Sequence, residues 1–256
     1  IDMICRLNQP GLAAPLFGDW PETILWSCLE GVMGEVWGDD PDRPQSAMAH
    51  LGDFCFFAGA PDRELAGFRP PEHRKPYALL IPQNDAWAAC MEEIYGTRVR
   101  RFTRYATKKE PSFSPERLRV LADSLPNPYT IRNIDSKLYD QCSKMEWSRD
   151  LLGQFSSWEQ FCHLGLGFCV LLGEEPVSGA SSFSRYREGI EIEIDTRPDH
   201  QRRGLARACG ARLILECLDR GLYPSWDAHT AASLALAEQL GYRLDHPYTA
   251  FEITDC

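Results

Sequence analysis

Three carboxylates recur at every second position in one short stretch of the sequence. Glu191, Glu193 and Asp195 alternate there with the isoleucines of residues 190–194. Successive side chains of a β-strand point to opposite faces of its sheet, so the carboxylates share one face and the isoleucines the other. In an interior strand, loss of water and mutual repulsion raise the pKa of such carboxyls toward the range of a general base. On an edge strand, the same alternation indicates only a solvated face.

An arginine-rich turn follows this stretch. Residues 201–207 read Gln-Arg-Arg-Gly-Leu-Ala-Arg and open a long run with helical spacing of apolar residues. Arg202 and Arg203 at a helix N-terminus oppose the helix macrodipole, and a bound anion would compensate for this cost. Gly204 permits close approach of the backbone, and the free N–H groups of a first helical turn bind phosphate. The alternative is a pair of surface arginines neutralised by Asp199.

The chain from residue 129 onward supplies elements that can hold both features. Turn residues and apolar periodicity divide it into alternating strands and helices. The expected strands are 129–134, 168–172, 176–184, 190–196 and 223–227, the expected helices are 136–145, 157–164, 204–220 and 231–240, and a strand pair ends the chain. This order predicts an α/β fold in which a mixed central sheet has helices on both faces.

The first half of the chain predicts a smaller α/β domain. A helix has its apolar face over residues 24–33 and is closed by turn residues at 34–42. Strands are expected at 53–58, 77–81 and 98–107, and a helix starting at 84 or 85 ends at 95. The strand–helix–strand order of 77–107 is repeated at 223–253, but such units are common in α/β proteins, so chance is the favoured explanation.

Composition excludes several classes of partner. The 256 residues carry 37 acidic and 27 basic side chains, and the net charge of −10 argues against nucleic acid or an anionic membrane as the main partner. The ten cysteines have no Cys-x-x-Cys spacing, so we expect no metal site and cysteines that pack as small core residues. With no signal peptide and no long apolar run, a cytoplasmic location is expected.

The motif Gln-x-x-Gly-x-Ala at 201–206, placed between a strand and a long helix, resembles the acetyl-CoA pyrophosphate loop of the GNAT acetyltransferase superfamily. The phrases SGASSFS at 178–184, EIEIDTRP at 191–198 and LYPSWDAHTAAS at 222–233 are similar to the branch of zwittermicin-resistance-type acetyltransferases. The resemblance implies a GNAT-like acyl-CoA N-acyltransferase fold for residues 129–256. Residues 111–128 would form a proline-rich connection around one short helix, 115–124, and residues 1–110 an N-terminal domain that contributes to the acceptor pocket.

The resemblance also implies which residues bind acetyl-CoA. Backbone groups at the strand end would meet the pantetheine arm, the loop would hold the pyrophosphate, and the start of the helix at 231 would meet the CoA arm. The residues are Ile194, Asp195, Thr196, Gln201, Arg202, Arg203, Gly204, Leu205, Ala206, Arg207, Thr230 and Ser233. Thr230 stands where the family commonly has an asparagine.

For catalysis, the carboxylate face offers the general base that takes the proton of the attacking amine. Glu193 is the first choice and Glu191 the second, and Asp227 is a weaker candidate for substrate binding. Many family members have a tyrosine four residues before the glycine of a Gly-Phe pair, which protonates the leaving thiolate. Here that pair is Gly241-Tyr242 and the position holds Ala237. The general acid stays open among Ser233, a water molecule, Tyr242 and Tyr248.

The basic segment 98–109 has two interpretations. It contains six arginines and lysines and no acidic residue, which is typical of a solvated strand face. The alternative is contact with the 3′-phosphate of the cofactor or with an acidic substrate.

The resulting expectation is an acetyl-CoA-dependent N-acetyltransferase that acts on a small amine by direct attack, without a metal. Two alternatives are an acyl-CoA-binding pseudo-enzyme or sensor without turnover and a protein N-acetyltransferase. The sequence leaves the oligomeric state open.

Overall fold

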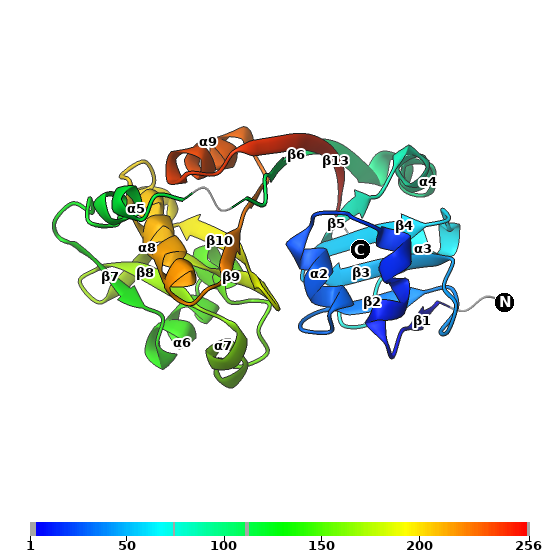
Figure 1. Cartoon of the computed structure of the whole chain (residues 1–256), viewed down its shortest axis with the longest axis horizontal. Helices are drawn as coiled ribbons and strands as arrows, with labels where there is room; N and C mark the ends of the chain where they lie inside the picture. Colours follow the sequence, from blue (N-terminus) through cyan, green and yellow to red (C-terminus); the bar gives the residue numbers. More distant parts are fainter. Residues whose placement is uncertain (1–3, 74, 111–112, 255–256) are drawn as a thin grey trace. The chain divides into compact units, whose positions relative to one another are not determined.

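The computed structural model describes residues 4–73, 75–110 and 113–254, which form two compact units (Figure 1). Unit 1 contains the chain up to Arg104 and again from Pro247, and unit 2 contains Tyr105–His246. Strands β6 (Val99–Thr107) and β13 (Leu244–Thr254) each run from one unit into the other. This division differs from the expected ranges 1–110, 111–128 and 129–256. Residues 1–3, 74, 111–112 and 255–256 of those ranges lie outside the described part of the chain.

Unit 2 is built on a five-stranded sheet with the strand order β11-β10-β9-β8-β7. All neighbouring strands are antiparallel except β10 and β11, which are parallel. The strands are β7 (Tyr129–Asn133), β8 (Gly167–Leu172), β9 (Glu175–Tyr186), β10 (Gly189–Thr196) and β11 (Tyr223–Ser225). Strand β10 is therefore an interior strand at residues 189–191, where β9 and β11 flank it, and the stretch that includes Glu191 meets the condition for a functional carboxylate face.

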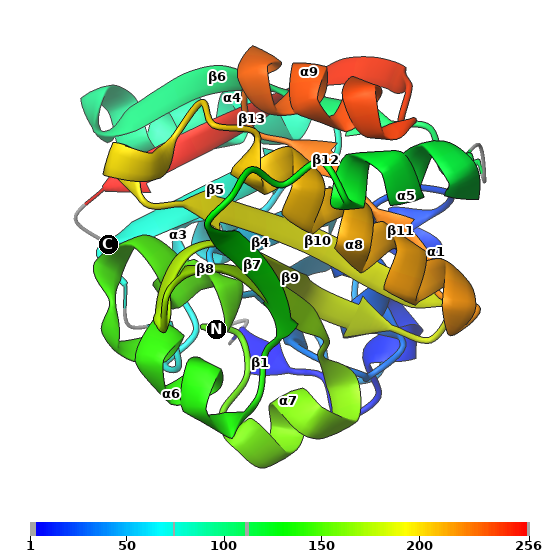
Figure 2. The ribbon, with the colours of Figure 1, turned by 90° about the vertical axis from the view of Figure 1, so that its left-hand side faces the viewer.

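Helices cover both faces of this sheet (Figure 2). On one face, Phe168 and Ile190 share a buried core with Leu205 and other residues of helix α8 (Leu205–Asp219). On the other face, the Cys169 Sγ atom of β8 lies 3.7 Å from Cys142 Sγ of helix α6. The other helical elements of unit 2 are α5 (Pro115–Ala122), α6 (Ser136–Lys144), the 3₁₀ helix η3 (Glu146–Leu151), α7 (Trp158–Leu164), the short 3₁₀ turn η4 (Pro198–His200) and α9 (Ala231–Leu240). The expected mixed sheet with helices on both faces is confirmed.

Helix α5 packs as part of unit 2. Leu118 is only 1% exposed and joins the core that contains α8, while Ser114 caps the helix by accepting a hydrogen bond from the Arg117 N–H. The segment expected as a proline-rich connection thus contributes a core helix, because one face of that helix is apolar.

Unit 1 is a smaller α/β body, as expected. Its strands follow the order β1-β2-β3-β4-β5-β13-β6. The part of β6 up to Arg104 belongs to unit 1. Trp87, Phe57 and Phe251 are fully buried at its centre. The elements are β1 (Cys5–Arg6), η1 (Pro10–Ala13), α1 (Ala14–Phe17), α2 (Thr23–Leu29), β2 (Glu35–Gly38), β3 (Ser46–Leu51), β4 (Phe54–Gly59), α3 (Arg63–Gly67), β5 (Tyr77–Pro82), α4 (Asp85–Tyr95) and η2 (Gly96–Arg98).

Three expectations about individual elements are wrong. Residues 34–42 were expected to be a turn, yet β2 lies within them, and β3 was not expected at all. Strand β3 is buried at every position, so it lacks the alternation that identifies a half-exposed strand. The end of the chain is one long strand, β13, and not a strand pair.

In each of the two similar strand–helix–strand segments, 77–107 and 223–253, the last strand runs into the other unit and pairs there with a strand of the other segment. After β5 and α4, β6 continues into unit 2, where Ala106 pairs with Asp227 of the short strand β12 (Asp227–Ala228). After β12 and α9, β13 continues into unit 1, where Phe251 pairs with Leu80 of β5. The described residues contain no helix long and apolar enough to cross a membrane.

Candidate active site

The two faces of β10 have the chemistry that the sequence predicts. Ile190 and Ile192 are buried in the core beneath α8, and Ile194 lies against Gly210 of that helix. The carboxylates therefore lie on the opposite face. Glu191 is 4% exposed, and Glu193 is partly exposed.

Strands β10 and β11 separate part of the way along. Gly189, Ile190 and Glu191 pair with β11, and Glu191 lies opposite Ser225. The chain then turns at Trp226, and β12 pairs with β6 and not with β10. Among the described residues, no strand pairs with 192–196 on this side of β10, which leaves backbone groups available to a ligand.

Asp195 has a perturbed carboxyl on this face. Burial raises its pKa to about 6, repulsion by Asp150 adds to the rise, and a hydrogen bond shared with Glu193 offsets part of it. Its Oδ2 atom is buried and accepts no hydrogen bond within the described part of the protein. Gly179, opposite Asp195, leaves room for Leu151 of η3, because a Cβ atom there would lie 2.5 Å from a Leu151 methyl carbon.

Glu191 lies between two serines on neighbouring strands. Ser184 of β9 and Ser225 of β11 are its cross-strand partners, and both side chains are fully buried. Neither hydroxyl has a hydrogen-bond partner among the described residues. A buried hydroxyl without a partner is costly, so this pair marks a place where a ligand or water would be stabilised.

The loop after β10 leads into helix α8, whose N-terminus has no side-chain cap. Gly204, the N-cap of α8, has a φ of 77° and no side chain to cap the first turn. Arg202 also has a left-handed φ of 61°, which is unfavourable for a residue with a side chain. Within the described part of the chain, the first-turn N–H groups of α8 therefore have neither an intrahelical acceptor nor a side-chain cap.

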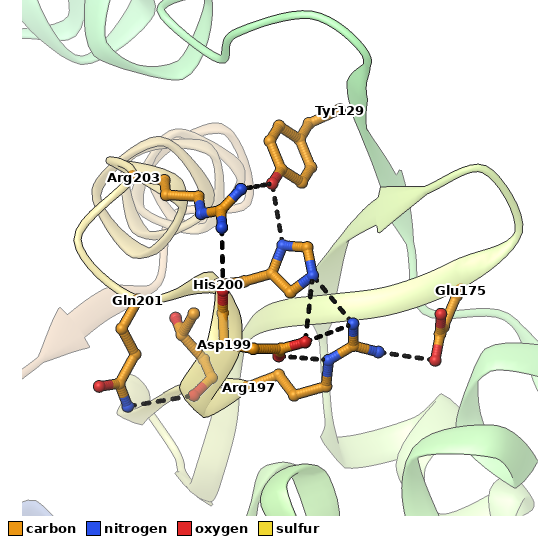
Figure 3. Close-up of polar contacts among 8 residues, drawn as sticks. Tyr129, Glu175, Arg197, Asp199, His200, Gln201 and Arg203 are labelled. Atoms are coloured by element: carbon orange, nitrogen blue, oxygen red, sulfur yellow. Dashed lines mark hydrogen bonds and ion pairs between the residues drawn. The ribbon is translucent and has the colours of Figure 1, made fainter.

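The two arginines of this loop are not neutralised by Asp199. The Asp199 carboxylate pairs with Arg197, with Oδ1 2.7 Å from Nε. Arg203 bonds only to the backbone oxygen of Asp199 and to the Tyr129 hydroxyl, both neutral acceptors (Figure 3). Within the described residues, neither Arg202 nor Arg203 forms an ion pair with a carboxylate. The uncapped helix end and these two charges together suit a phosphate group.

The other residues expected to bind the cofactor have structural hydrogen bonds. The Gln201 amide donates to the Thr196 carbonyl at 3.4 Å, which ties the loop to the end of β10 (Figure 3). The Thr230 hydroxyl caps α9 by accepting from the Ser233 N–H. The Ser233 hydroxyl accepts from the Trp226 indole and keeps its own proton for donation. Leu205 is buried beneath the loop, Ala206 is partly exposed, and Arg207 donates to Gln239 of α9.

The candidate general acids differ in accessibility. The Tyr242 hydroxyl is buried, donates to the Pro224 carbonyl at 2.5 Å and has a pKa raised well above its usual value by burial. Tyr248 belongs to unit 1, where its hydroxyl accepts from Arg104. Ala237 is fully buried. Ser233, in the first turn of α9, keeps a proton for donation.

The basic segment of β6 is largely paired within unit 1. Arg100 pairs with Glu252, Arg101 pairs with Glu92, and the Arg104 guanidinium lies over the ring of Phe54. These contacts support the interpretation as a strand face. The described residues contain no group of three or more His, Cys, Asp or Glu side chains able to hold a metal ion.

Three contributors to the site were not predicted from the sequence. Asp150 reaches Asp195 from η3, Tyr129 reaches the loop from β7, and His200 is the buried residue of the loop itself. No local pattern identifies the first two, because only the folded sheet brings them close. His200 had one available signal, its position directly before the loop motif at 201–206.

The comparisons with known proteins identify the class. A family model described as GNAT acetyltransferase matches residues 14–251. The chain therefore belongs to the GNAT acetyltransferase family and is an N-acetyltransferase, and the match includes most of the N-terminal half. Members of this superfamily generally use acetyl-CoA.

Individual relatives agree with this assignment. The chain is 25% identical over 239 residues to an uncharacterized N-acetyltransferase, YdfB, of Bacillus subtilis, with 90% of this chain and 89% of the relative covered. A crystal structure of a GCN5-related N-acetyltransferase-like protein from Streptococcus suis is 52% identical, with a TM-score of 0.90 over 96% of this chain and 98% of that chain. A tandem GNAT protein from the clavulanic acid biosynthesis pathway shares the fold, at 11% identity and a TM-score of 0.55 over 99% and 98% of the two chains.

Proposed function

We propose that this enzyme transfers the acetyl group of acetyl-CoA to the amine of a small molecule, with a carboxylate of β10 as the general base. One observation carries the proposal. The carboxylate face of β10 lies beside the point where β11 separates, and the same strand leads into an uncapped helix end with two arginines that no described carboxylate neutralises.

The residues present fit acetyl-CoA. The first-turn amides of α8, with Arg202 and Arg203, would hold the pyrophosphate. The backbone of Ile194 and Thr196, with which no described strand pairs on the β11 side of β10, would bind the pantetheine arm. When bound, acetyl-CoA supplies an acetyl group activated as a thioester.

The carboxylate face has two roles in this proposal. Its negative charge attracts a cationic amine, and one carboxylate then takes the ammonium proton so that the neutral nitrogen can attack. Glu193 is the proposed base and Glu191 the second candidate. Asp195 supports Glu193 through their shared hydrogen bond.

Binding of the cofactor is tested first. Coenzyme A should raise the melting temperature of the wild-type protein, because a ligand that binds only the folded state stabilises it. No stabilisation by coenzyme A or acetyl-CoA would contradict the proposal and the sensor alternative together.

Catalysis is tested with Glu193→Gln. Release of free thiol from acetyl-CoA is measured over a panel of small amines and, separately, N-terminal peptides. For an amine that the wild type acetylates, the variant should retain coenzyme A binding and lose about 100-fold or more in kcat.

Glu188→Gln is the matched control, because Glu188 is exposed in the turn before β10. An unchanged kcat in Glu193→Gln would exclude Glu193 as the base, and a loss in Glu191→Gln alone would move the role there. Turnover with peptides but with no small amine would favour a protein N-acetyltransferase. Coenzyme A binding without turnover on any acceptor would favour a sensor.

A further inference from the structure

The loop that joins β10 to α8 has a single buried side chain. His200 is 6% exposed, whereas the other residues of the loop from 197 to 204 are partly or fully exposed. A buried polar side chain in an exposed loop needs hydrogen-bond partners, and those partners determine what it holds in place.

Both ring nitrogens of His200 have a partner (Figure 3). Nε2 lies 2.9 Å from Nη2 of Arg197, and Nδ1 lies 2.8 Å from the Tyr129 hydroxyl oxygen. A guanidinium can only donate, so Nε2 accepts. A neutral imidazole then has its proton on Nδ1 and donates it to Tyr129. His200 therefore bridges the start of the loop to strand β7.

The Arg197 end of this bridge is fixed by two carboxylates. Its Nε and Nη2 atoms donate to both oxygens of Asp199, and Nη1 donates to Glu175 of β9 at 2.6 Å. These bonds orient the guanidinium whose Nη2 atom faces His200.

The Tyr129 end connects the bridge to the arginines of the loop. The Tyr129 hydroxyl oxygen accepts a second hydrogen bond, from Arg203 Nη1 at 3.1 Å, and Arg203 Nη2 donates to the Asp199 carbonyl at 3.1 Å. His200 and Arg203 therefore converge on one oxygen atom of β7.

The residue between these fixed points has an unfavourable conformation. Arg202, with its φ of 61°, persists only where its surroundings hold it in place. The Gln201–Thr196 hydrogen bond holds one side of it, and the Tyr129–Arg203 contact holds the other.

We propose that His200 is a positioning residue for the cofactor, which keeps the loop in its phosphate-binding shape by bridging Arg197 to Tyr129 and, through Tyr129, to Arg203. The inference rests on the proposed function, because it assigns the residue that shapes the proposed pyrophosphate loop. It assigns His200 no contact with the acetyl group or the amine.

The test measures the dissociation constant of coenzyme A by calorimetry in His200→Phe, His200→Gln and Tyr129→Phe. Phe keeps the ring and removes both hydrogen bonds, so His200→Phe should raise the dissociation constant about tenfold. Gln can still accept from Arg197 and should recover part of that loss. The double variant Tyr129→Phe/His200→Phe should bind about as well as His200→Phe alone, because both changes break one bridge.

His163→Gln is the control for a histidine change, since His163 is exposed on α7. In the proposed case, kcat at saturating acetyl-CoA stays within about twofold of wild type while KM for acetyl-CoA rises with the dissociation constant. Exact additivity of the two changes overturns the bridge. Equal coenzyme A binding by wild type and Tyr129→Phe overturns it even if His200→Phe fails to fold. Absence of coenzyme A binding by the wild type would instead contradict the proposed function.

Discussion

At the residue scale, one acidic side chain connects the chemistry of the site to its stability. Asp195 was expected to share the carboxylate face and to offer backbone groups to the cofactor, and its carboxyl has a pKa raised to about 6 by burial and by Asp150. The same burial that disfavours its charged form makes it able to hold a proton near neutral pH. The alternation of carboxylates predicted this face, but Asp150 belongs to a distant 3₁₀ helix that the sequence pattern does not connect with β10.

Asp195→Asn is expected to stabilise the protein at pH 8. The folded protein binds the Asp195 proton more tightly than the unfolded chain, whose aspartates titrate near pH 3.9, so wild-type stability falls as pH rises from about 4 to about 6. Asn is never charged and removes this loss, which amounts to at most about 3 kcal/mol. Chemical unfolding at pH 4 and pH 8 measures the difference.

Asp150→Asn tests whether repulsion by Asp150 contributes to the raised pKa of Asp195. It should move the fall in stability to lower pH, because it removes the second source of the rise in the pKa of Asp195. A stability difference between Asp195→Asn and wild type that is the same at both pH values would contradict this account.

At the element scale, strands and helices with a clear period were predictable and fully buried or short ones were not. Helix α8 and strand β10 were predicted from the sequence because one face of each is apolar and the turn between them contains Gly204. Strand β3 was missed because all its positions are buried, and β2 because it is short and followed by turn-forming residues. The loop motif was predicted, whereas its support by Tyr129 depends on the β7–β8 pairing, which sequence spacing alone does not give.

Gly204→Ala should weaken coenzyme A binding, and Gly173→Ala is its control. Both glycines have a left-handed φ, 77° and 64°, and a Cβ atom at either position meets nothing closer than 3.8 Å. Each substitution should therefore cost about 1 kcal/mol of stability through backbone strain alone. Only Gly204→Ala alters the start of α8, so only it should raise the dissociation constant of coenzyme A. If calorimetry gave Gly204→Ala and Gly173→Ala the same dissociation constant for coenzyme A, the conformation of Gly204 would not shape the phosphate loop.

At the scale of the whole molecule, the order of the chain does not follow the division into compact units. A boundary near residue 110 was expected because prolines cluster there, but the prolines flank a helix whose Leu118 is buried in unit 2. The exchange of β6 and β13 explains why the C-terminal strand supplies core residues to the N-terminal unit. The family match over residues 14–251 includes residues of both units.

Because β13 runs into unit 1, a substitution near the C-terminus is expected to destabilise unit 1. Phe251 is fully buried in the unit 1 core and pairs with Leu80 of β5, so Phe251→Ala should cost about 3–5 kcal/mol and loosen unit 1. Native-state hydrogen exchange should show faster exchange of the β5 amides, far away in the sequence, with α8 amides unchanged. Phe168→Ala, which empties a comparable volume in the unit 2 core, should have the reverse effect. Faster exchange throughout both units in either variant would mean that they unfold as one cooperative body and would contradict the prediction.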